Sequence, residues 1–538
     1  MLRNASDMEY KQFKINQMKK INYKTLRLNI LVAICSVLVV SCKKNNEEAS
    51  KSAEGTLVKP AYNRSTVFRN PLNGWVMYGS GTGNPTYWDN QYYVPDLGKS
   101  VKAIDYASAC YIRTSWRNFN PSNGVYAWRD PSSAICKMIK GAHDRGLPIA
   151  FRIVVDGRDQ GLNTPQFVFD AGAKFYLENA SFQDRKTPYP QDPIFRQYYA
   201  KFIEELAKDF NDPNKTSFID AYGLGKWGEA HNVIYFDPAL NTSTQKVEEA
   251  KEEVMDWISD LYTKNFTKIP LAMNYHRVVG DPVSWGSANP NAGRLLNKMI
   301  EKGYSLRQDA FGMTEYYGSW EKAFAKTWNF KRPILMEGGW ITSGTHRYWT
   351  DPSGKYREGF PEDVRKGEFD SSAEAAVNMM DFRVGDTESW FTKAFTFVQR
   401  FTSEGGYRVY PDQVYLPETA NTNSEVTITH RWRNMGWGYL PNNIPQWNYK
   451  YKVAFALLDE GGAVKKIFVD KEAEPSTWLK NVPKRYELKT TLGVPAGSYT
   501  WAVAIVDSTV DNKPGIRLSV NGDITTGGWL KLLNVQVQ

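Results

Sequence analysis

The sequence predicts a mixed α/β fold, a (β/α)8 barrel followed by an all-β sandwich domain, from three observations. The chain has 538 residues, which is too long for one small domain and suits a large barrel with an accessory domain. Short apolar runs alternate with amphipathic stretches through the middle of the chain. After Arg408 the pattern changes to alternating apolar and polar residues, which is typical of antiparallel strands.

Eight apolar runs are predicted to be the strands of the barrel. They cover residues 74–78, 108–114, 148–155, 218–224, 269–275, 309–314, 333–337 and 377–383. Between them, apolar residues recur at helical spacing, most clearly over 195–210, 247–261 and 390–401. Eight strand–helix units over about 340 residues predict a (β/α)8 barrel at 67–408, with a doubly wound open sheet as the alternative.

The segment 409–538 is predicted to be a separate β-sandwich. Residues 449–458 and 499–506 alternate between apolar and polar side chains, as strands with one buried face do. Glycine-containing turn signals at 460–462 and 495–497 separate such runs. The chain is therefore predicted to contain two globular domains.

Residues 1–42 are predicted to be a targeting segment rather than part of the fold. A basic stretch ends at Arg27, and the apolar run 28–40 is too short to span a bilayer as a stable helix. Cys42 follows this run in a setting that resembles the lipobox of bacterial lipoproteins, which implies lipidation of Cys42; an ordinary secretory signal is the alternative. The polar residues 43–66 are predicted to be a flexible tether. The protein is expected in the cell envelope, anchored to the outer membrane and either periplasmic or surface-exposed.

Charge and histidine content exclude several classes of function. The formal charge is +9, but +5 of it lies in residues 1–42, so the rest of the chain predicts no basic surface for nucleic acid. The five histidines form no metal-ligand motif, and no metal or cofactor is predicted. The aromatic fraction of 14 % provides many flat apolar faces that can stack on sugars. Cys110 and Cys136 are predicted to be two thiols, with a disulfide as the alternative.

Two carboxylates follow predicted strands and are the candidate catalytic groups. Glu229 lies close to Trp227 after the fourth strand, and Glu337 ends the seventh. In a (β/α)8 barrel the carboxyl ends of all strands meet at one face, where the reacting groups lie. One protonated and one ionised carboxyl group at such a face can together cleave a glycosidic bond. The alternatives are a helix N-terminal charge for Glu229 and a buried ion pair with Arg113 or Arg152 for Glu337.

An acid on strand four and a nucleophile on strand seven resemble the arrangement of the clan A glycoside hydrolases. Residues 111–116 and 120–128 also resemble the Trp…Pro-x-x-Gly-x-Tyr-x-Trp passage after the second strand of many such barrels. The chain departs from most clan A enzymes at Gly228, where they have an asparagine before the acid/base. A closer resemblance, to exported bacterial proteins regarded as candidate glycosidases, lies in the segments 70–75, 220–231, 406–408 and 434–437.

The resemblance implies a retaining glycoside hydrolase that acts on an oligo- or polysaccharide without a cofactor, with Glu229 as acid/base and Glu337 as nucleophile. Further substrate-binding groups are expected at the opening of the barrel: Arg152, Trp116, Trp227, His231, Tyr275, His276, Tyr316 and Trp340. For each of these, a structural role in the core or in an ion pair is the alternative. The competing function is a non-catalytic, glycan-binding lipoprotein on the same barrel.

Overall fold

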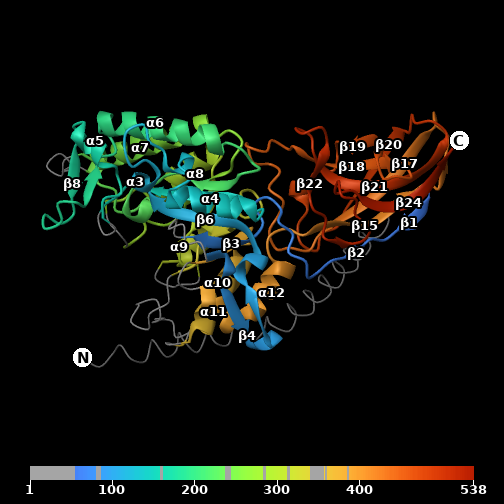
Figure 1. Cartoon of the computed structure of the whole chain (residues 1–538), viewed down its shortest axis with the longest axis horizontal. Coiled ribbons are helices and arrows are strands. Elements are labelled where there is room, and N and C mark those ends of the chain that lie inside the picture. The colour runs from blue at the N-terminus through green and yellow to red at the C-terminus, as the bar shows by residue number, and fades with distance from the viewer. Residues whose placement is uncertain are drawn as a thin grey trace, which may run out of the picture. The chain divides into compact units, whose positions relative to one another are not determined.

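The computed structural model describes residues 55–79, 87–157, 161–236, 244–282, 286–311, 316–339, 357, 360–383 and 387–538. Eight parallel strands form a closed barrel, and further strand-rich sheets follow toward the C-terminus (Figure 1). The predicted fold class is therefore confirmed, and the closure of the barrel excludes the doubly wound open sheet.

The barrel strands succeed one another around the barrel in chain order. They are β3 (Gly74–Gly79), β6 (Ala107–Ser115), β7 (Ile149–Val154), β10 (Thr216–Asp220), β11 (Leu271–Asn274), β12 (Ser305–Gln308), β13 (Ile334–Met336) and β14 (Met379–Phe382). Seven of them overlap the predicted runs. The prediction of 309–314 for the sixth strand is wrong, because the true strand, β12, carries the polar Ser305 and Arg307 at alternate positions and so lacks an apolar run.

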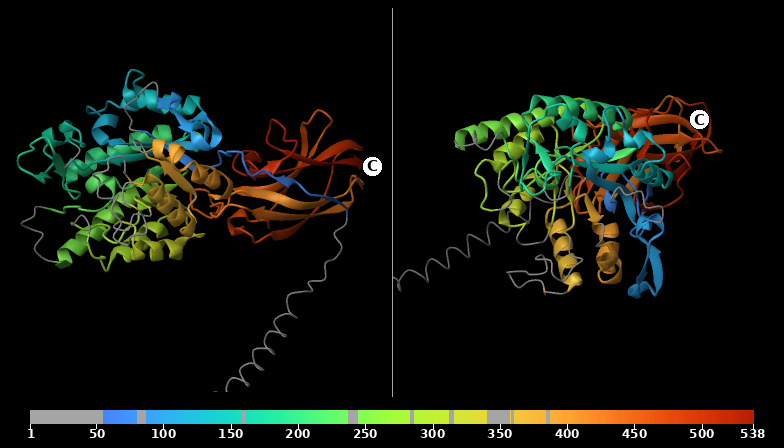
Figure 2. Two further views of the ribbon diagram at one scale, coloured as in Figure 1. Left: turned by 90° about the horizontal axis from the view of Figure 1, so that it is seen from below. Right: turned by 60° about the vertical axis from the view of Figure 1, so that its left-hand side comes forward.

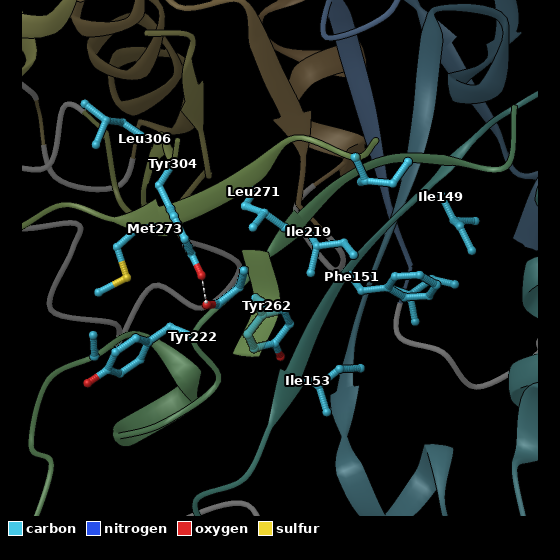
Figure 3. Packing of buried hydrophobic residues seen from close by; sticks show 14 of the residues in the cluster. Ile149, Phe151, Ile153, Ile219, Tyr222, Tyr262, Leu271, Met273, Tyr304 and Leu306 are labelled. Carbon is cyan, nitrogen blue, oxygen red and sulfur yellow. Dashed lines mark hydrogen bonds between the residues drawn. The ribbon is translucent and has the colours of Figure 1, made fainter. Parts of the chain in front are cut away.

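Alternation along the strands separates two sets of buried side chains. Outward-facing residues such as Ile149, Phe151 and Ile219 pack with aromatic residues of the surrounding helices and loops, among them Tyr262 (Figure 3). Inward-facing residues lie in layers, as barrel interiors do. The lower layer is apolar and contains Val76, Ala109, Ala150, Phe218, Ala272, Leu335 and Met379. The upper layer, nearer the carboxyl ends of the strands, is charged.

Helices lie around the outside of the barrel strands (Figures 1 and 2). The start of α6 shows how the sequence sets a boundary: the Asp192 side chain accepts hydrogen bonds from the N–H groups of Ile194 and Phe195, and Pro193 occupies the first turn. The helices are α3 (Trp116–Phe119), α4 (Ala134–Asp144), α5 (Gln166–Asp170), α6 (Pro193–Phe210), α7 (Thr244–Asn265), α8 (Ala292–Glu301), α9 (Ser319–Trp328), α10 (Pro361–Glu374), α11 (Thr387–Thr392) and α12 (Phe395–Glu404).

Two small hairpins extend the loops after β3 and β7. They are β4–β5 (Gln91–Val94 and Lys99–Lys102) and β8–β9 (Phe175–Leu177 and Lys186–Pro188).

Two mainly antiparallel sheets are formed largely by the chain after the barrel, in orders β1 (Thr56–Val58)–β15–β17–β20 and β16–β24–β21–β18–β19, with β22 beside β21. Trp432, Val453 and Val503 belong to the buried apolar cluster that residues of both sheets form. The strands are β15 (Val409–Leu416), β16 (Thr419–Ala420), β17 (Glu425–Asn434), β18 (Tyr451–Leu458), β19 (Val464–Asp470), β20 (Lys484–Thr491), β21 (Gly497–Asp507), β22 (Lys513–Ile516) and β24 (Leu530–Val537).

Part of the segment predicted to be a flexible tether, 43–66, forms strands. β1 (Thr56–Val58) pairs with β15, and β2 (Ala61–Tyr62) pairs with β23 (Val520–Asn521). The physical reason is that the edge of a sheet offers backbone partners to segments of three and two residues, which are too short to give a strand signal of their own. Residues 43–54 and the predicted lipidation site Cys42 lie outside the described residues.

Cys110 and Cys136 are free thiols, as expected from the sequence. Burial raises the pKa of the Cys110 thiol to about 12, so this cysteine stays protonated. Among the helices that the structure describes, none is long and apolar enough to cross a membrane. The apolar run 28–40 lies outside that part of the chain.

Candidate active site

The upper inward layer of the barrel gathers charged side chains from several strands. Arg152 comes from β7, Asp220 from β10, Arg307 from β12 and Asp381 from β14, while Glu337 directly follows β13. All five residues are buried. Buried charges persist only where partners neutralise them, and these side chains accordingly form one network of ion pairs.

Arg152 joins the two carboxylates that the sequence singles out. Its Nη1 lies 2.8 Å from Glu229 Oε1, and its Nη2 lies 2.7 Å from Glu337 Oε2. The same guanidinium donates to Asp220 Oδ2 at 3.1 Å and to Asn274 Oδ1 at 2.9 Å. A planar guanidinium holds such partners in a defined geometry, so Arg152 fixes Glu229 and Glu337 relative to each other.

Asp309, the residue after β12, adds a third carboxylate to this pair. One carboxylate oxygen of each of Glu229, Asp309 and Glu337 lies within 4.8 Å of the others. Arg383 Nη1 joins two of them, at 3.3 Å from Asp309 Oδ1 and 3.2 Å from Glu337 Oε1. Retaining glycosidases hold their two carboxyl groups about 5–5.5 Å apart, and inverting ones about 6.5–9.5 Å apart. One oxygen of Glu229 lies within 4.8 Å of one oxygen of Glu337, so the two carboxyl groups are close enough to act on one bond.

Glu229 is positioned by a strained loop rather than by a strand. The fourth strand ends at Asp220, earlier than the predicted residue 224, and the loop then returns to the barrel. Trp227 and Ala230, on either side of Glu229, have φ angles of 59° and 61°. This left-handed conformation costs a residue with a side chain about 1–2 kcal/mol. Such strain persists only where the surrounding structure holds it, and it is concentrated at functional sites.

Two predicted histidines support this loop. His276 Nε2 lies 2.7 Å from the backbone oxygen of Glu229. Burial, with a further contribution from nearby His231, lowers the pKa of His276 to about 3, so the neutral ring donates this hydrogen bond. His231 Nε2 lies 3.6 Å from Glu229 Oε2. The structure therefore brings both histidines to Glu229, one to its backbone and one to its carboxylate.

The backbone and the surroundings of Gly228 explain why this chain has no asparagine directly before Glu229. Its φ is +75°, and a Cβ there would lie 3.3 Å from Cδ of Arg152. We expect Gly228→Asn to lower the free energy of unfolding by about 1–2 kcal/mol and to displace Arg152, without increasing activity. Thermal melting and activity assays of Gly228→Asn measure both effects.

Gly124 provides a matched control for this substitution. It has a similar φ of +76°, but no atom lies within 4 Å of its would-be Cβ. Gly124→Asn therefore reports the conformational cost alone. Equal losses of stability in the two variants would contradict the predicted contact with Arg152.

The three carboxyl groups differ in their affinity for a proton. Burial alone raises the pKa of Glu337, but Arg152, Arg307 and Arg383 together hold it well below its ordinary value. Glu229 is also lowered in pKa, because its interactions with His231 and Arg152 outweigh burial. Burial raises the pKa of Asp309 well above its ordinary value, and the nearby charges of Glu337 and Glu229 add to this effect against that of Arg383.

Sequence reasoning missed Asp220, Arg307, Asp309, Asp381 and Arg383. Asp220 Oδ2 accepts a hydrogen bond of 2.5 Å from the Tyr111 hydroxyl, and Arg307 Nη2 donates to Asp381 Oδ2 at 3.0 Å. A signal was present for Asp220 and Asp381, because each is a charged residue between two apolar ones, the pattern that singled out Arg152. Applied to every predicted strand, that rule finds Asp220 and Asp381 but not Arg307, because 305–308 was not predicted to be a strand.

Exposure to solvent differs across the site. The Asp309 side chain is 19 % exposed and that of Arg383 12 %. Arg113 is 11 % exposed, Glu229 3 % and Glu337 0 %. Asp309 is thus the most exposed of the three carboxyl groups.

Other predicted substrate-binding residues lie elsewhere. Trp116 is fully buried against Phe195, Tyr199 and other rings, so the prediction of a sugar-stacking role is replaced by one in the core between β6 and α6. Tyr275 is also fully buried, with its hydroxyl 3.1 Å from that of Tyr317, because it directly follows the inward-facing Asn274 and so faces outward.

Three predicted substrate-binding residues remain, and the structure describes two of them, Tyr316 and Trp227. Tyr316 is buried. Trp227 is half-buried, and the Lys226 ammonium lies 4.6 Å from the centre of its ring. Trp340 lies outside the described residues.

The spacing of Glu229, Asp309 and Glu337 would by itself also suit a cation. Guanidinium nitrogens of Arg152 and Arg383 already lie 2.7–3.3 Å from these carboxylates. The positive charge that an ion would supply is thus provided by arginine, and we assign no metal ligands here.

Neither a protein-family model nor a curated protein sequence matches the chain. Among solved structures, it is similar to the endo-beta-1,4-mannanase from Thermotoga petrophila, with 11 % identity and a TM-score of 0.36 over 87 % of this chain and 98 % of that chain. It is also similar to endo-glycoceramidase II from Rhodococcus sp., with 11 % identity and a TM-score of 0.36 over 81 % of this chain and 100 % of that chain. Similarity at this level does not assign an activity.

Proposed function

We propose that this protein is a glycoside hydrolase that cleaves an oligo- or polysaccharide with retention of configuration. The observation that supports this most strongly is the convergence of Glu229 and Glu337, far apart in the sequence, at the carboxyl ends of the strands of a closed barrel. Their nearest oxygens lie within 4.8 Å of each other. The strained loop that carries Glu229 is further support, since such strain marks functional sites.

The proposed reaction is a double displacement at the anomeric carbon. Glu337, held ionised by three arginines, attacks this carbon while Glu229 delivers a proton to the departing oxygen. A glycosyl ester on Glu337 results. Glu229 then removes a proton from water, which attacks the anomeric carbon and releases Glu337. Glu337, Glu229 and one water molecule supply both nucleophiles and every proton, so the proposal needs no cofactor.

A non-catalytic glycan-binding protein is the second candidate, and one observation favours it. Arg152 pairs directly with both Glu229 and Glu337, whose side chains are 3 % and 0 % exposed. A network of this kind could also serve as a brace of the barrel. The two candidates differ in one respect, because only a hydrolase turns the glycan over.

A panel of substrates tests the proposal directly. We expect the wild-type protein to release the aglycone from at least one aryl glycoside or to shorten at least one oligosaccharide, with the anomeric configuration retained in the first product seen by NMR. Inverted product would contradict the assigned roles. Binding of glycans without turnover across the panel would instead support the second candidate.

We further propose that the protein is exported and anchored to the membrane through a lipid on Cys42. This part of the proposal is supported by residues 28–42 alone.

A further inference from the structure

The buried network at the carboxyl end of the barrel contains one more carboxyl group than guanidinium groups, and His231 lies beside Glu229, with Nε2 3.6 Å from Oε2. Its guanidinium groups, within the described residues, are those of Arg113, Arg152, Arg307 and Arg383. Its carboxyl groups, over the same part of the chain, are those of Asp220, Glu229, Asp309, Glu337 and Asp381. An excess charge in a region with little solvent is costly, so a proton held within the network is favourable. The question is which group holds it.

The arginines support the three central carboxylates unequally. Glu337 has guanidinium nitrogens at 2.7 Å from Arg152, 3.3 Å from Arg307 and 3.2 Å from Arg383. Glu229 has Arg152 at 2.8 Å. Among the described residues, Asp309 has a guanidinium contact with Arg383 alone, at 3.3 Å.

The nitrogen that serves Asp309 is also shared. Arg383 Nη1 lies 3.2 Å from Glu337 Oε1 and 2.9 Å from the backbone oxygen of Gly338. Asp309 therefore has the weakest cationic support of the three, while two ionised carboxylates lie within 4.8 Å of it. Like charges at this distance favour a proton on one of the groups.

Asp309 Oδ1 also accepts a hydrogen bond from the N–H of Ala310 at 2.7 Å, but the other two carboxyl groups, Asp220 and Asp381, have closer guanidinium partners. Asp220 Oδ2 accepts from the Tyr111 hydroxyl at 2.5 Å and from Arg152 at 3.1 Å. Asp381 accepts from the N–H of Gly338 at 2.9 Å and from Arg307 at 3.0 Å. Of Glu229, Asp309 and Glu337, Asp309 has the most exposed side chain. A proton on Asp309 can therefore exchange with solvent.

We propose that Asp309 stores the proton that Glu229 delivers to the leaving oxygen. This inference rests on the proposed function, and it makes Asp309 a positioning residue that acts through Glu229. A separation of up to 4.8 Å is spanned by one water molecule, which suffices for proton transfer. The raised pKa of Asp309 and the lowered pKa of Glu229 agree with a resting proton on Asp309.

The proton is conserved over one cycle. Asp309 passes its proton through water to Glu229, and Glu229 gives it to the departing oxygen as the glycosidic bond breaks and Glu337 bonds to the anomeric carbon. In the second step Glu229 takes a proton from the attacking water, the ester bond to Glu337 breaks, and the proton returns to Asp309. The sum is one water consumed and one glycosidic bond hydrolysed.

Melting temperature against pH tests where the proton resides, without any substrate. A carboxyl group with a raised folded pKa contributes stability below its unfolded pKa of about 3.9 and loses it as pH rises. Asparagine mimics the protonated acid, so we expect Asp309→Asn to melt above wild type at pH 7, by a margin that grows as pH rises from 4. Failure of Asp309→Asn to fold, or a margin that does not grow, would overturn the proposal.

Glu229→Gln is the matched control for this experiment. Its carboxylate has a lowered pKa, so its contribution to stability is present above the unfolded pKa of about 4.3 and is lost at lower pH. We therefore expect Glu229→Gln to melt below wild type at pH 7, opposite to Asp309→Asn. If the two variants shift in the same direction, the assignment of the proton to Asp309 is wrong.

Kinetics test whether the stored proton is used. In Asp309→Asn, Glu229 must carry the proton itself, so we expect the alkaline limb of the pH profile of kcat/KM to move down by at least about one pH unit. The loss of kcat/KM should be at least about tenfold larger for a methyl glycoside, which needs protonation, than for a 2,4-dinitrophenyl glycoside. Asp309→Glu, which retains a carboxyl group, should restore the alkaline limb.

The two proposals can fail separately. An unmoved alkaline limb in Asp309→Asn overturns the relay even if the wild type is an active hydrolase. Absence of turnover by the wild type overturns the proposed function, and the melting experiment then still decides whether Asp309 holds the proton.

Discussion

Replacing Glu337 by glutamine is expected to reduce kcat/KM for glycoside cleavage by about 10⁴-fold or more. Glutamine has nearly the same size but no negative charge, so it cannot form the glycosyl ester. The fully buried Glu337 is kept ionised by Arg152, Arg307 and Arg383, which makes it ready to attack at any pH near neutral. Initial rates on the best aryl glycoside of the panel measure the effect.

Glu321→Gln is the matched control for this variant. Glu321 is also fully buried and pairs with Arg277, yet it lies on α9, outside the barrel interior. A loss confined to Glu337→Gln separates chemistry from folding. A 2-fluoro glycoside should also leave a covalent adduct on the peptide that contains Glu337, seen by mass spectrometry. Activity of Glu337→Gln within tenfold of wild type would remove the nucleophile assignment.

Replacing Arg152 by methionine is expected to lower the free energy of unfolding by about 3–5 kcal/mol. The Arg152 side chain is 0 % exposed and pairs with Asp220, Glu229 and Glu337, so its removal leaves carboxylates buried without sufficient positive charge. Activity should fall by about 10²-fold or more in the protein that remains folded, because Glu229 and Glu337 are no longer held together. Urea denaturation and kcat measurements test the two effects.

Arg365→Met separates the two effects. Arg365 is equally buried, but it pairs with Glu368 on α10, whose other carboxylate oxygen accepts a hydrogen bond from the N–H of Gly339 rather than from an arginine of the network. We expect it to lose stability while the folded protein keeps its activity. Arg152→Lys is a second comparison, since one ammonium cannot donate to Glu229 and Glu337 with the geometry of a guanidinium. An Arg152→Met protein that melts like wild type would show that the network is not held by this residue.

The alternation of strands and helices was predictable because it depends on local patterns. Seven strands can be predicted from apolar runs in the sequence, since their outward side chains pack against helices. The sixth does not, because Arg307 faces the charged layer of the barrel. The polar residues that face the site interrupt the apolar run by which this strand could be predicted. The sequence therefore predicts a strand that begins at Asp309, whereas Asp309 follows the strand.

For the aromatic residues the error is of the opposite kind, because a side chain predicted to lie at the site lies in the core. Trp116 was a candidate for sugar stacking because it follows a strand, but its ring is fully buried among Phe195, Tyr199 and their neighbours. A tryptophan after a barrel strand can face the site or the helices, and the direction depends on the turn that follows. The sequence gives the residue type, but only the fold determines whether the side chain faces the site or the core.

By itself, the sequence determined the order of the helices and strands and singled out Glu229 and Glu337 as candidate catalytic groups. Both depend on local properties, namely the hydrophobic period and the residue type. Only the tertiary structure decided how these glutamates are charged. Arginines from β7, β12 and the end of β14 reach them across the barrel, while Asp309 is left with one shared guanidinium. The proton affinity of a buried carboxyl group depends on neighbours that are distant in the chain, and no local pattern contains that information.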